Sequence, residues 1–276
     1  GGGGGGGGGS KGAIAMMLPT EPQKKRKWLF VLVLVAIYIW AFAGIPLAAI
    51  KENVGQILGA IFYGLIHPDW SYVYTGDGED LFSLMIETVA IAFVGTFISS
   101  LLSIPFAFWA ARSKNTPRFL SSTGKVVLTA IRTFPEIVLA IMFIKTVGPG
   151  SFAGVLAVSV HSIGMLAKLY SEAIENMDQG PSESVVSAGG NRWAVLGFAT
   201  LPQLIPEFLS FTLYRFELAV RSASILGIVG AGGIGTPMIF AINARSWSRV
   251  GIILLGIILT VTCIDFISGR LRKRLV

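Results

Sequence analysis

The amino-acid sequence predicts an all-α, polytopic membrane protein with about six transmembrane helices. Of the 276 residues, 53% are hydrophobic and only 13% are charged, about half the ~25% of charged residues in a typical soluble domain. Six stretches have the roughly 20 mostly apolar residues that a bilayer-spanning helix requires. They cover approximately residues 28–47, 83–111, 126–147, 152–171, 203–228 and 248–268. Lipid is therefore the expected main solvent of this chain.

The first apolar stretch, WLFVLVLVAIYIWAFAGIPL, contains no charge and follows the basic cluster at residues 24–27. A second basic cluster at residues 270–274 follows the last stretch. Such flanking clusters are typical of cytoplasmic anchors, because basic residues remain on the cytoplasmic side of a membrane. The net charge of +7 is therefore placed at the membrane, and no nucleic-acid partner is expected.

The loops between the stretches predict the orientation. Residues 112–125 carry four basic side chains and no acidic one, whereas residues 48–82 carry five acidic side chains and a single lysine. The positive-inside rule then places residues 112–125, 172–202 and 269–276 in the cytoplasm. We expect a multi-pass protein of the inner or plasma membrane, with both termini cytoplasmic.

This reading divides the chain into four parts. Residues 1–27 are a glycine linker and a cytoplasmic tail, with GGGGGGGGGS at 1–10 excluded from the fold. Residues 28–82 hold the first transmembrane helix and an extracytoplasmic segment. Residues 83–270 form the transmembrane core with the cytoplasmic loop 172–202, and residues 271–276 form a basic tail. The single cysteine, Cys263, excludes a disulfide framework and a cysteine metal cluster, and no metal site is expected.

The fifth apolar stretch carries polar residues at intervals of three and four, which places them on one face of a helix. They are Glu207, Ser210, Tyr214, Glu217, Arg221 and Ser224. A charge at mid-membrane costs about 2.5–3.5 kcal/mol on insertion scales, so this face should meet protein or water rather than lipid. Glu217 and Arg221 stand at i, i+4 and could pair with each other. Two interpretations stay open: a structural ion pair, or a role in lining a translocation path.

The third and fourth apolar stretches also contain polar or small residues at helical spacing. Lys125, Thr129, Arg132 and Glu136 recur at spacings of four, three and four, and Pro135 predicts a bend among them. In the fourth stretch, small residues favour close helix packing. They are Gly154, Ala157, Ser159 and Gly164. The lone His161 is more consistent with a hydrogen-bonded residue than with a proton relay.

A glycine-rich segment follows the fifth stretch. Gly230, Gly232 and Gly235 have the spacing G-x-G-x-x-G of dinucleotide-binding loops, but that motif requires a preceding strand and an acidic residue about 20 positions later. Residues 250–259 contain no acid, and no phosphate-binding loop with G-K-[ST] is present. These glycines, with Gly233, instead predict a tight re-entrant turn or close helix packing.

The cytoplasmic segment 172–202 is too polar to span and contains helical pattern on both sides of Gly189-Gly190. Pro181 and Ser182 are good first residues for a helix. Apolar side chains after the glycines could dock a partner or lie on the membrane surface. They are Trp193, Val195, Leu196 and Phe198.

The segment ESVVSAGGNRWAVLGFATLP resembles the "EAA" loop of ABC importer permeases, E-A-A-x3-G-x9-I-x-L-P. Glu183, Gly189, Leu201 and Pro202 match its spacing; Ser184, Val185 and Ala199 depart from it. Three further blocks resemble the phosphonate importer permeases of the binding-protein-dependent transport system inner-membrane component family, along nearly all of residues 80–270. They are RTFPEIVLAIMFI (132–144), FAGVLAVSVHSIGMLAKLYSEAIE (152–175) and YRFELAVRSASILGIVGAGGIG (214–235).

The resemblance implies an ABC type I importer permease fold and a set of partners. They are a second copy of the chain, two ATP-binding subunits and an extracytoplasmic solute-binding protein. It implies no cofactor in this chain, because ATP and Mg belong to the partner subunit. The cytoplasmic loop would be the coupling helix, with ATPase contacts at Glu183, Ser187, Ala188, Gly189, Gly190, Arg192 and Trp193. The glycine segment, Gly230, Gly232, Gly233 and Gly235, would lie near the outer gate.

The expected function is that of a translocation subunit, not an enzyme, importing phosphonate, phosphate or phosphite by alternating access. An anion path calls for positive charge or N–H donors, which Arg132, Arg221 and Ser224 supply, while Glu136 and Glu217 temper the arginines and Tyr214 lies on the same face. The alternatives are a permease for a different small anionic solute and an ion channel. A membrane enzyme would need a catalytic cluster that the sequence does not offer.

Overall fold

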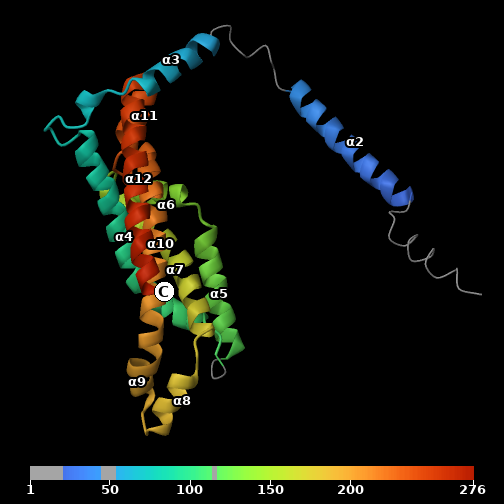
Figure 1. Cartoon of the computed structure of the whole chain (residues 1–276), viewed down its shortest axis with the longest axis vertical. Coiled ribbons are helices and arrows are strands. Elements are labelled where there is room, and N and C mark those ends of the chain that lie inside the picture. The colour runs from blue at the N-terminus through green and yellow to red at the C-terminus, as the bar shows by residue number, and fades with distance from the viewer. Residues whose placement is uncertain (1–20, 45–53, 114–116) are drawn as a thin grey trace, which may run out of the picture. The chain divides into compact units, whose positions relative to one another are not determined.

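The computed structural model describes residues 21–44, 54–113 and 117–276, and these are helices joined by short turns (Figure 1). The glycine linker, most of the N-terminal tail, residues 45–53 and Lys114 lie outside the described residues. The chain divides into two units, Gly1–Leu58 and Gly59–Val276, which are treated separately. In the first unit, helix α2 spans Glu21–Gly44 and thus includes the basic cluster that precedes the predicted span.

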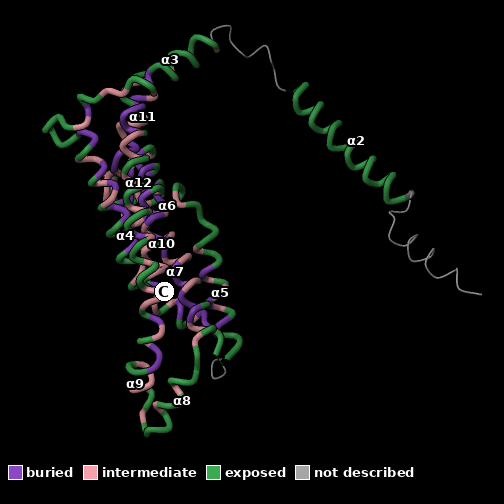
Figure 2. Tube along the Cα trace, viewed as in Figure 1, coloured by how far each residue is buried: buried purple, intermediate pink, exposed green. Residues whose placement is uncertain are grey.

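Every side chain from Pro22 to Gly44 is exposed (Figure 2). A surface helix of a soluble protein is apolar on one face only, whereas α2 is apolar on all sides from residue 28 to residue 44. A helix of this kind is stable only where lipid or other apolar groups surround it. The first predicted span is therefore confirmed as a helix of sufficient length and hydropathy.

In the second unit, four long helices form the bundle, and shorter helices lie beside them or at their ends (Figure 1). The long helices are α4 (Leu81–Ala110), α7 (Ser151–Glu175), α10 (Leu201–Leu226) and α12 (Trp247–Leu275). The shorter ones are α3 (Val54–Ile66, which begins in the first unit), α5 (Arg118–Thr133), α6 (Glu136–Val147), α8 (Gly180–Ser187), α9 (Arg192–Val195) and α11 (Gly235–Asn243). Within the described residues, five helices are long and apolar enough to cross a membrane, or six if α5 and α6 count as one bent span.

The third predicted span is not one straight helix. Residues 126–147 fall into α5 and α6, whose axes meet at 82°. Pro135 lacks the N–H that would continue the helix, and it drives the preceding residue into the extended region; Phe134 accordingly has φ −69° and ψ 122°. The bend that Pro135 predicts is present, and the continuous span is corrected to a broken one.

The predicted basic tail at residues 271–276 is helical for most of its length. Residues 271–276 were predicted as a separate basic tail, whereas α12 continues as a helix to Leu275. Lysine and arginine side chains are favourable in the last turn of a helix, because they offset the negative end of its dipole. Arg272, Lys273 and Arg274 occupy that turn.

Helices α4 and α7 pack closely along most of their length. A Cβ added to Gly95 of α4 would lie 2.7 Å from Val158 Cγ1, and one added to Gly154 of α7 would lie 2.4 Å from the Ala231 carbonyl oxygen. All four small residues expected to favour close packing on α7 are buried: Gly154, Ala157, Ser159 and Gly164. Since lipid tails are as apolar as leucine, this close backbone approach supplies van der Waals contact that lipid would not.

Helix α10 packs against α4, α7 and α12 and so lies at the centre of the unit. Its buried residues Ala219, Val220 and Ala223 join Ala157 and Val158 of α7 in the largest hydrophobic cluster, visible as the buried interior in Figure 2. Before α10, a short π-helical segment (Leu196–Thr200) links it to α9, so that residues 192–229 run as one helical rod.

The loop before α4 is organised around one carboxylate. Asp80 is fully buried and caps α4 by accepting from the Ser83 N–H at 2.9 Å, while its other oxygen accepts from the Thr75 N–H at 3.0 Å. Hydrogen bonds to Ser83 and to the loop backbone favour the ionised form and lower the pKa of Asp80 to about 2.

This network predicts that acid loosens the loop. Because the folded pKa of Asp80 lies below the ordinary value of 3.8, its contribution to stability is complete above about pH 4 and is lost as pH falls toward 2. Backbone hydrogen exchange of residues 75–83, scaled to unstructured-peptide rates, should therefore increase over this pH range in the wild type.

In Asp80→Asn the same amides should exchange rapidly at pH 5.5 already and show little further change on acidification. Asp69→Asn, which removes a carboxylate that accepts from the Ser71 hydroxyl, serves as the control and should keep the wild-type profile. Equal protection of the wild type at pH 5.5 and pH 2 would contradict the role given to Asp80.

Candidate functional site

Charged side chains connect α10 to α12 at two levels. Glu217 Oε1 lies 3.0 Å from Arg272 Nη2, and the Glu217 side chain is only 8% exposed. One turn further along α10, Arg221 pairs with Asp265. Each residue of the predicted Glu217–Arg221 pair therefore has its partner on α12, and the expected mutual pair is wrong. The reason is tertiary: α12 packs alongside α10 and presents the opposite charge at each level.

Two other members of the predicted polar face take part in packing. The Arg272 guanidinium lies over the Tyr214 ring, 5.3 Å from its centre, which adds a cation–π contact to the α10–α12 interface. Ser224 is buried and donates its hydroxyl to the Val220 carbonyl at 2.9 Å. The structure thus brings Tyr214, Glu217 and Arg221 together on the α12 side and places Ser224 in the helix packing.

A third ion pair is almost completely enclosed. Arg215 Nη2 of α10 lies 3.5 Å from Glu136 Oε1 of α6, with side-chain exposures of 5% and 12%. Arg215 Nε also donates to the Ser162 hydroxyl of α7 at 2.7 Å. One side chain thus connects α10 to α6 and α7.

Arg215 is absent from the polar face that the sequence predicts on this helix. The spacing selects positions 214 and 217, and Arg215 lies one position off that face. An arginine within an apolar stretch is itself a signal, because it demands a counter-charge. The same signal applies to Asp265, the acidic residue of the last span.

A third set of charges lines two neighbouring cavities between α5 and α7. The deeper cavity, about 420 Å³, is lined by Arg132, His161, Met165, Lys168 and Leu169. A smaller one, about 230 Å³, shares Arg132 and Lys168 and extends to Lys125, Glu172 and Glu175. Arg132 is exposed, in contrast to the buried Arg215, so the arginine that the sequence placed on a path does face an open space.

The glycine segment is a tight turn between α10 and α11. Gly230, Gly232 and Gly233 have φ of 97°, 82° and 85°, a region that side chains other than glycine disfavour. A Cβ on Gly232 would lie 2.9 Å from the Ser151 backbone, and one on Gly233 would lie 2.7 Å from the Thr88 hydroxyl. The prediction of a tight turn with close packing is confirmed, because Gly232 lies against Ser151 of α7 and Gly233 against Thr88 of α4.

Hydrogen bonds hold this turn in place. The Ile234 N–H donates to the Thr88 hydroxyl at 2.8 Å, and the Gly150 N–H donates to the Gly230 carbonyl at 2.9 Å. The Ser151 hydroxyl donates to Glu87 of α4. These bonds connect the turn to the N-terminal parts of α4 and α7.

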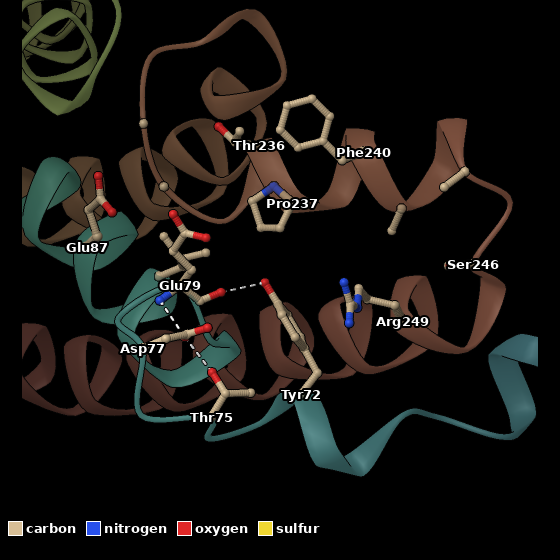
Figure 3. A pocket seen from close by; sticks show the side chains of 15 residues that line it. Tyr72, Thr75, Asp77, Glu79, Glu87, Thr236, Pro237, Phe240, Ser246 and Arg249 are labelled. Carbon is tan, nitrogen blue, oxygen red and sulfur yellow. Dashed lines mark hydrogen bonds between the residues drawn. The ribbon is translucent and has the colours of Figure 1, made fainter.

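A larger pocket, about 570 Å³, lies beside this turn. Figure 3 shows Asp77, Glu79 and Glu87 on one side of it and Arg249 on the other, close to the Tyr72 ring. Arg249 lies 4.6 Å from the centre of that ring. Burial raises the pKa of the Tyr72 hydroxyl, and nearby Arg249 partly offsets this. Three carboxylates against one guanidinium make this pocket unfavourable for an anion.

The segment 172–202 forms two short helices around a glycine turn, as predicted. Helix α8 begins with Pro181 in its first turn, Gly189 has φ 89°, and the Asn191 side chain caps α9 by accepting from the Ala194 N–H at 2.9 Å. The residues expected to contact an ATPase are exposed at Glu183, Ser187, Ala188, Gly189, Arg192 and Trp193, with Gly190 half-buried. Trp193 and Phe198 are 76% and 78% exposed, which makes this end of the unit a surface suited to a protein partner.

The bundle, its interhelical charges and this exposed helical hairpin define a membrane transport subunit. In agreement, residues 103–276 match the family described as "Binding-protein-dependent transport system inner membrane component". The chain therefore belongs to this family. Membership makes it a multi-pass inner-membrane permease with ATP-binding subunits and a solute-binding protein as partners, and it places ATP hydrolysis in a separate subunit.

Two relatives share much of the sequence. The chain is 39% identical over 189 residues to the "Phosphite transport system permease protein PtxC" of Stutzerimonas stutzeri, covering 68% of this chain and 69% of that protein. It is 39% identical over 216 residues to the "Phosphate-import permease protein PhnE" of Mycolicibacterium smegmatis, covering 78% of this chain and 40% of that protein.

Solved structures confirm the fold. A chain of the MetNI methionine ABC transporter in an inward-facing conformation aligns with a TM-score of 0.61 at 20% identity, covering 71% of this chain and 96% of that chain. A chain of an amino acid ABC transporter aligns with a TM-score of 0.58 at 19% identity, covering 70% and 93%. The predicted ABC type I importer permease fold is confirmed.

The enclosed ion pair predicts a large effect of removing one charge. Glu136→Gln leaves the Arg215 guanidinium buried without its counter-charge, which should destabilise the protein by about 3–5 kcal/mol. The measurement is the fraction that stays monodisperse in detergent after graded heating. Glu207→Gln, which removes an exposed carboxylate from α10, the helix that carries Arg215, is the matched control and should behave like the wild type.

Replacing both partners by apolar residues, Glu136→Leu with Arg215→Met, should recover much of the loss, since no buried charge then remains. A Glu136→Gln protein as heat-resistant as the Glu207→Gln control would show that Arg215 does not depend on this carboxylate.

Proposed function

We propose that this chain is the permease subunit of an ATP-driven importer of phosphonate or a related phosphorus oxyanion, phosphate or phosphite. The observation that carries the proposal is the 39% identity to two permeases named for phosphite and for phosphate transport. Both names denote small tetrahedral phosphorus oxyanions. Positive side chains exposed to cavities within the bundle support the same class of substrate, because an anion crossing a membrane requires them.

We further propose a homodimer with both termini in the cytoplasm. The basic residues at 24–27, 112–125 and 270–274 would then lie on one side of the membrane, as the positive-inside rule requires. Helices α8 and α9 would lie on that side as well and would contact the ATP-binding subunits, which hold ATP and Mg. The acidic loop around Asp77 would face the solute-binding protein.

The continuous rod of residues 192–229 supports a mechanism of alternating access. Movement of an ATPase subunit at Trp193 would be carried along α10 to the glycine turn at Gly230–Gly235, which we propose lies near the outer gate. The ion pairs of Glu217 and Arg221 with α12, and of Arg215 with Glu136, would make neighbouring helices move with α10. In this mechanism Glu136, Tyr214, Glu217, Arg221 and Ser224 hold the moving helices together, and Arg132 meets the substrate.

Transport by the complete complex tests the substrate class. In proteoliposomes that contain this permease, its ATP-binding subunits and its solute-binding protein, we expect ATP-dependent uptake of phosphate, phosphite or a simple alkylphosphonate. Sulfate, which has a similar shape but no phosphorus, should not be taken up. Uptake of none of the three phosphorus anions would reject the proposal, and ATP-independent ion current would favour a channel.

Two variants of the 172–202 segment, one on α8 and one in the glycine turn, test the proposed role in coupling to the ATPase. Glu183→Lys reverses an exposed charge on α8, and Gly189→Val places a branched side chain at φ 89°, which strains the turn. Each should lower uptake about tenfold or more, in the range of a lost coupling free energy of roughly 1–3 kcal/mol, while ATP hydrolysis continues.

Gly197→Ala is the matched control, because a Cβ at this position meets no atom within 4 Å; it should keep coupled uptake. The coupling role is contradicted if Glu183→Lys and Gly189→Val both assemble and transport at the control rate.

A further inference from the structure

The deeper of the two cavities between α5 and α7 is lined by two cations and by no carboxylate. Its lining residues are Arg132, His161, Met165, Lys168 and Leu169. Arg132 projects from the last turn of α5, and the other four belong to α7. The side chains that could bind a ligand therefore come from two helices that pack against each other.

Arg132 differs in its partners from the two arginines of α10, Arg215 and Arg221, and from Arg272 of α12. Among the described residues, no carboxylate lies within ion-pair distance of Arg132, and no hydrogen bond to its guanidinium is formed, whereas Arg215, Arg221 and Arg272 all have carboxylate partners. His161 lines the same cavity, with its Nδ1 atom buried and the Glu136–Arg215 pair nearby. Arg132 thus faces this cavity with its capacity to bind an anion unused.

Lys168 is held only loosely. Its ammonium lies 3.9 Å from Glu172 Oε1, and the two side chains are 46% and 51% exposed. An exposed i, i+4 pair of this length contributes little to stability, so Lys168 can leave Glu172 for another anion at small cost. Further toward the same end of α7, Lys125 and Glu175 form a closer pair at 3.0 Å that neutralises the end of the smaller cavity.

The backbone fixes Arg132 in position. A Cβ on Gly164 of α7 would lie 2.7 Å from Arg132 Cγ and 3.2 Å from its backbone nitrogen, so the glycine lets the aliphatic stem of the arginine lie directly against α7. Pro135 ends α5 just beyond. At 1.5 Å per residue, Arg132 is roughly 10 Å along α5 from Lys125, the last residue assigned to the cytoplasm, and His161 is roughly 15 Å from the start of α7, both within a hydrocarbon layer of about 30 Å.

An arginine at that depth without a counter-charge requires water or an anion. The pocket beside the glycine turn does not meet this description, because three carboxylates line it. The two spaces are therefore opposite in charge, and the cavity at Arg132 is the one that suits an anion.

We propose that this cavity is a transient binding station for the transported oxyanion, in which Arg132 and Lys168 bind the phosphorus oxygens and His161 adds a hydrogen bond. This inference rests on the proposed function. Arg132 can engage two oxygens with its planar guanidinium, and Lys168 acts as a point charge. The station releases its anion because Lys168 returns to Glu172, so affinity stays low enough for passage.

The same chemistry would suit the phosphate of an anionic lipid, since a headgroup carries similar oxygens. The depth of Arg132 favours a free ion, because headgroups lie at the ends of the helices. The experiment must therefore separate the two sources.

A cysteine in the cavity wall reports on the station while its cations remain in place. In a Cys263→Ala background, Met165→Cys is introduced into the complete complex in vesicles of neutral phosphatidylcholine, and its reaction with anionic and cationic methanethiosulfonate reagents is timed. We expect the anionic reagent to react about tenfold faster or more, as for a cleft lined by one sign of charge. Phosphate or an alkylphosphonate should slow that reaction.

Arg132→Gln and Lys168→Gln should each bring the two reagent rates toward equality, whereas Arg132→Lys should retain much of the preference. Lys273→Gln, which removes an exposed cation from the far end of α12, is the charge control and should change neither the reagent preference nor uptake. Phe97→Cys, at an exposed apolar position of α4, is the control for reagent that enters through lipid.

Equal rates of the two reagents at Met165→Cys, or no reaction, would overturn the proposal. Protection by added phosphatidylglycerol but not by free phosphate or alkylphosphonate would overturn it in favour of a lipid site. Uptake by the wild-type complex separates this inference from the proposed function: an anion-selective cavity in a complex that imports no phosphorus oxyanion rejects the function alone. Normal uptake with Arg132→Gln and Lys168→Gln combined rejects the station alone.

Discussion

The arrangement of this bundle depends on one constraint: an ionised side chain within an apolar helix must have a counter-charge or water. Two helices, α6 and α12, meet that requirement by pairing their charges with those of α10. Glu136 of α6 neutralises Arg215, while Asp265 and Arg272 of α12 neutralise Arg221 and Glu217. Because each pair joins two different helices, satisfying the constraint also specifies which helices are neighbours. Ion pairs of this kind contribute specificity of packing more than net stability.

This constraint gives α10 its central mechanical position. It is continuous with the exposed α8–α9 end at residue 192 and reaches the glycine turn at residue 230. At that turn, Gly232 and Gly233 leave no space for a side chain between the loop and helices α4 and α7. A displacement at one end of α10 therefore cannot be absorbed by loose packing at the other, which is the property that alternating access requires of a transmitting helix.

Much of the fold could be predicted from composition and spacing, because the thickness of a bilayer specifies the length of a span and Pro135 has a local effect on its own helix. The glycine turn was also predictable, since positive φ and close approach are local demands. The interhelical partners were not. Periodicity identifies which residues share a face, but it does not say which helix covers that face, and so Glu217 and Arg221 were first considered as partners of each other. Arg215 lies one position from the predicted face. Its partners, Glu136 and Ser162, are known only from the packing of α6 and α7 against α10.

The same limit explains why Arg132 stands apart. In the sequence, Arg132, Arg215 and Arg221 are equivalent: each is an arginine within an apolar stretch. The structure distinguishes them by their partners. Arg215 pairs with Glu136 and Arg221 with Asp265, whereas Arg132 has no carboxylate partner among the described residues. An unused charge at depth is expensive to retain unless it serves a mobile ligand. A carboxylate-lined pocket at the glycine turn and a cation-lined cavity near mid-depth would together disfavour spontaneous entry of an anion and stabilise it once inside. A transporter built in this way needs its substrate delivered by another protein, which agrees with membership of a binding-protein-dependent family.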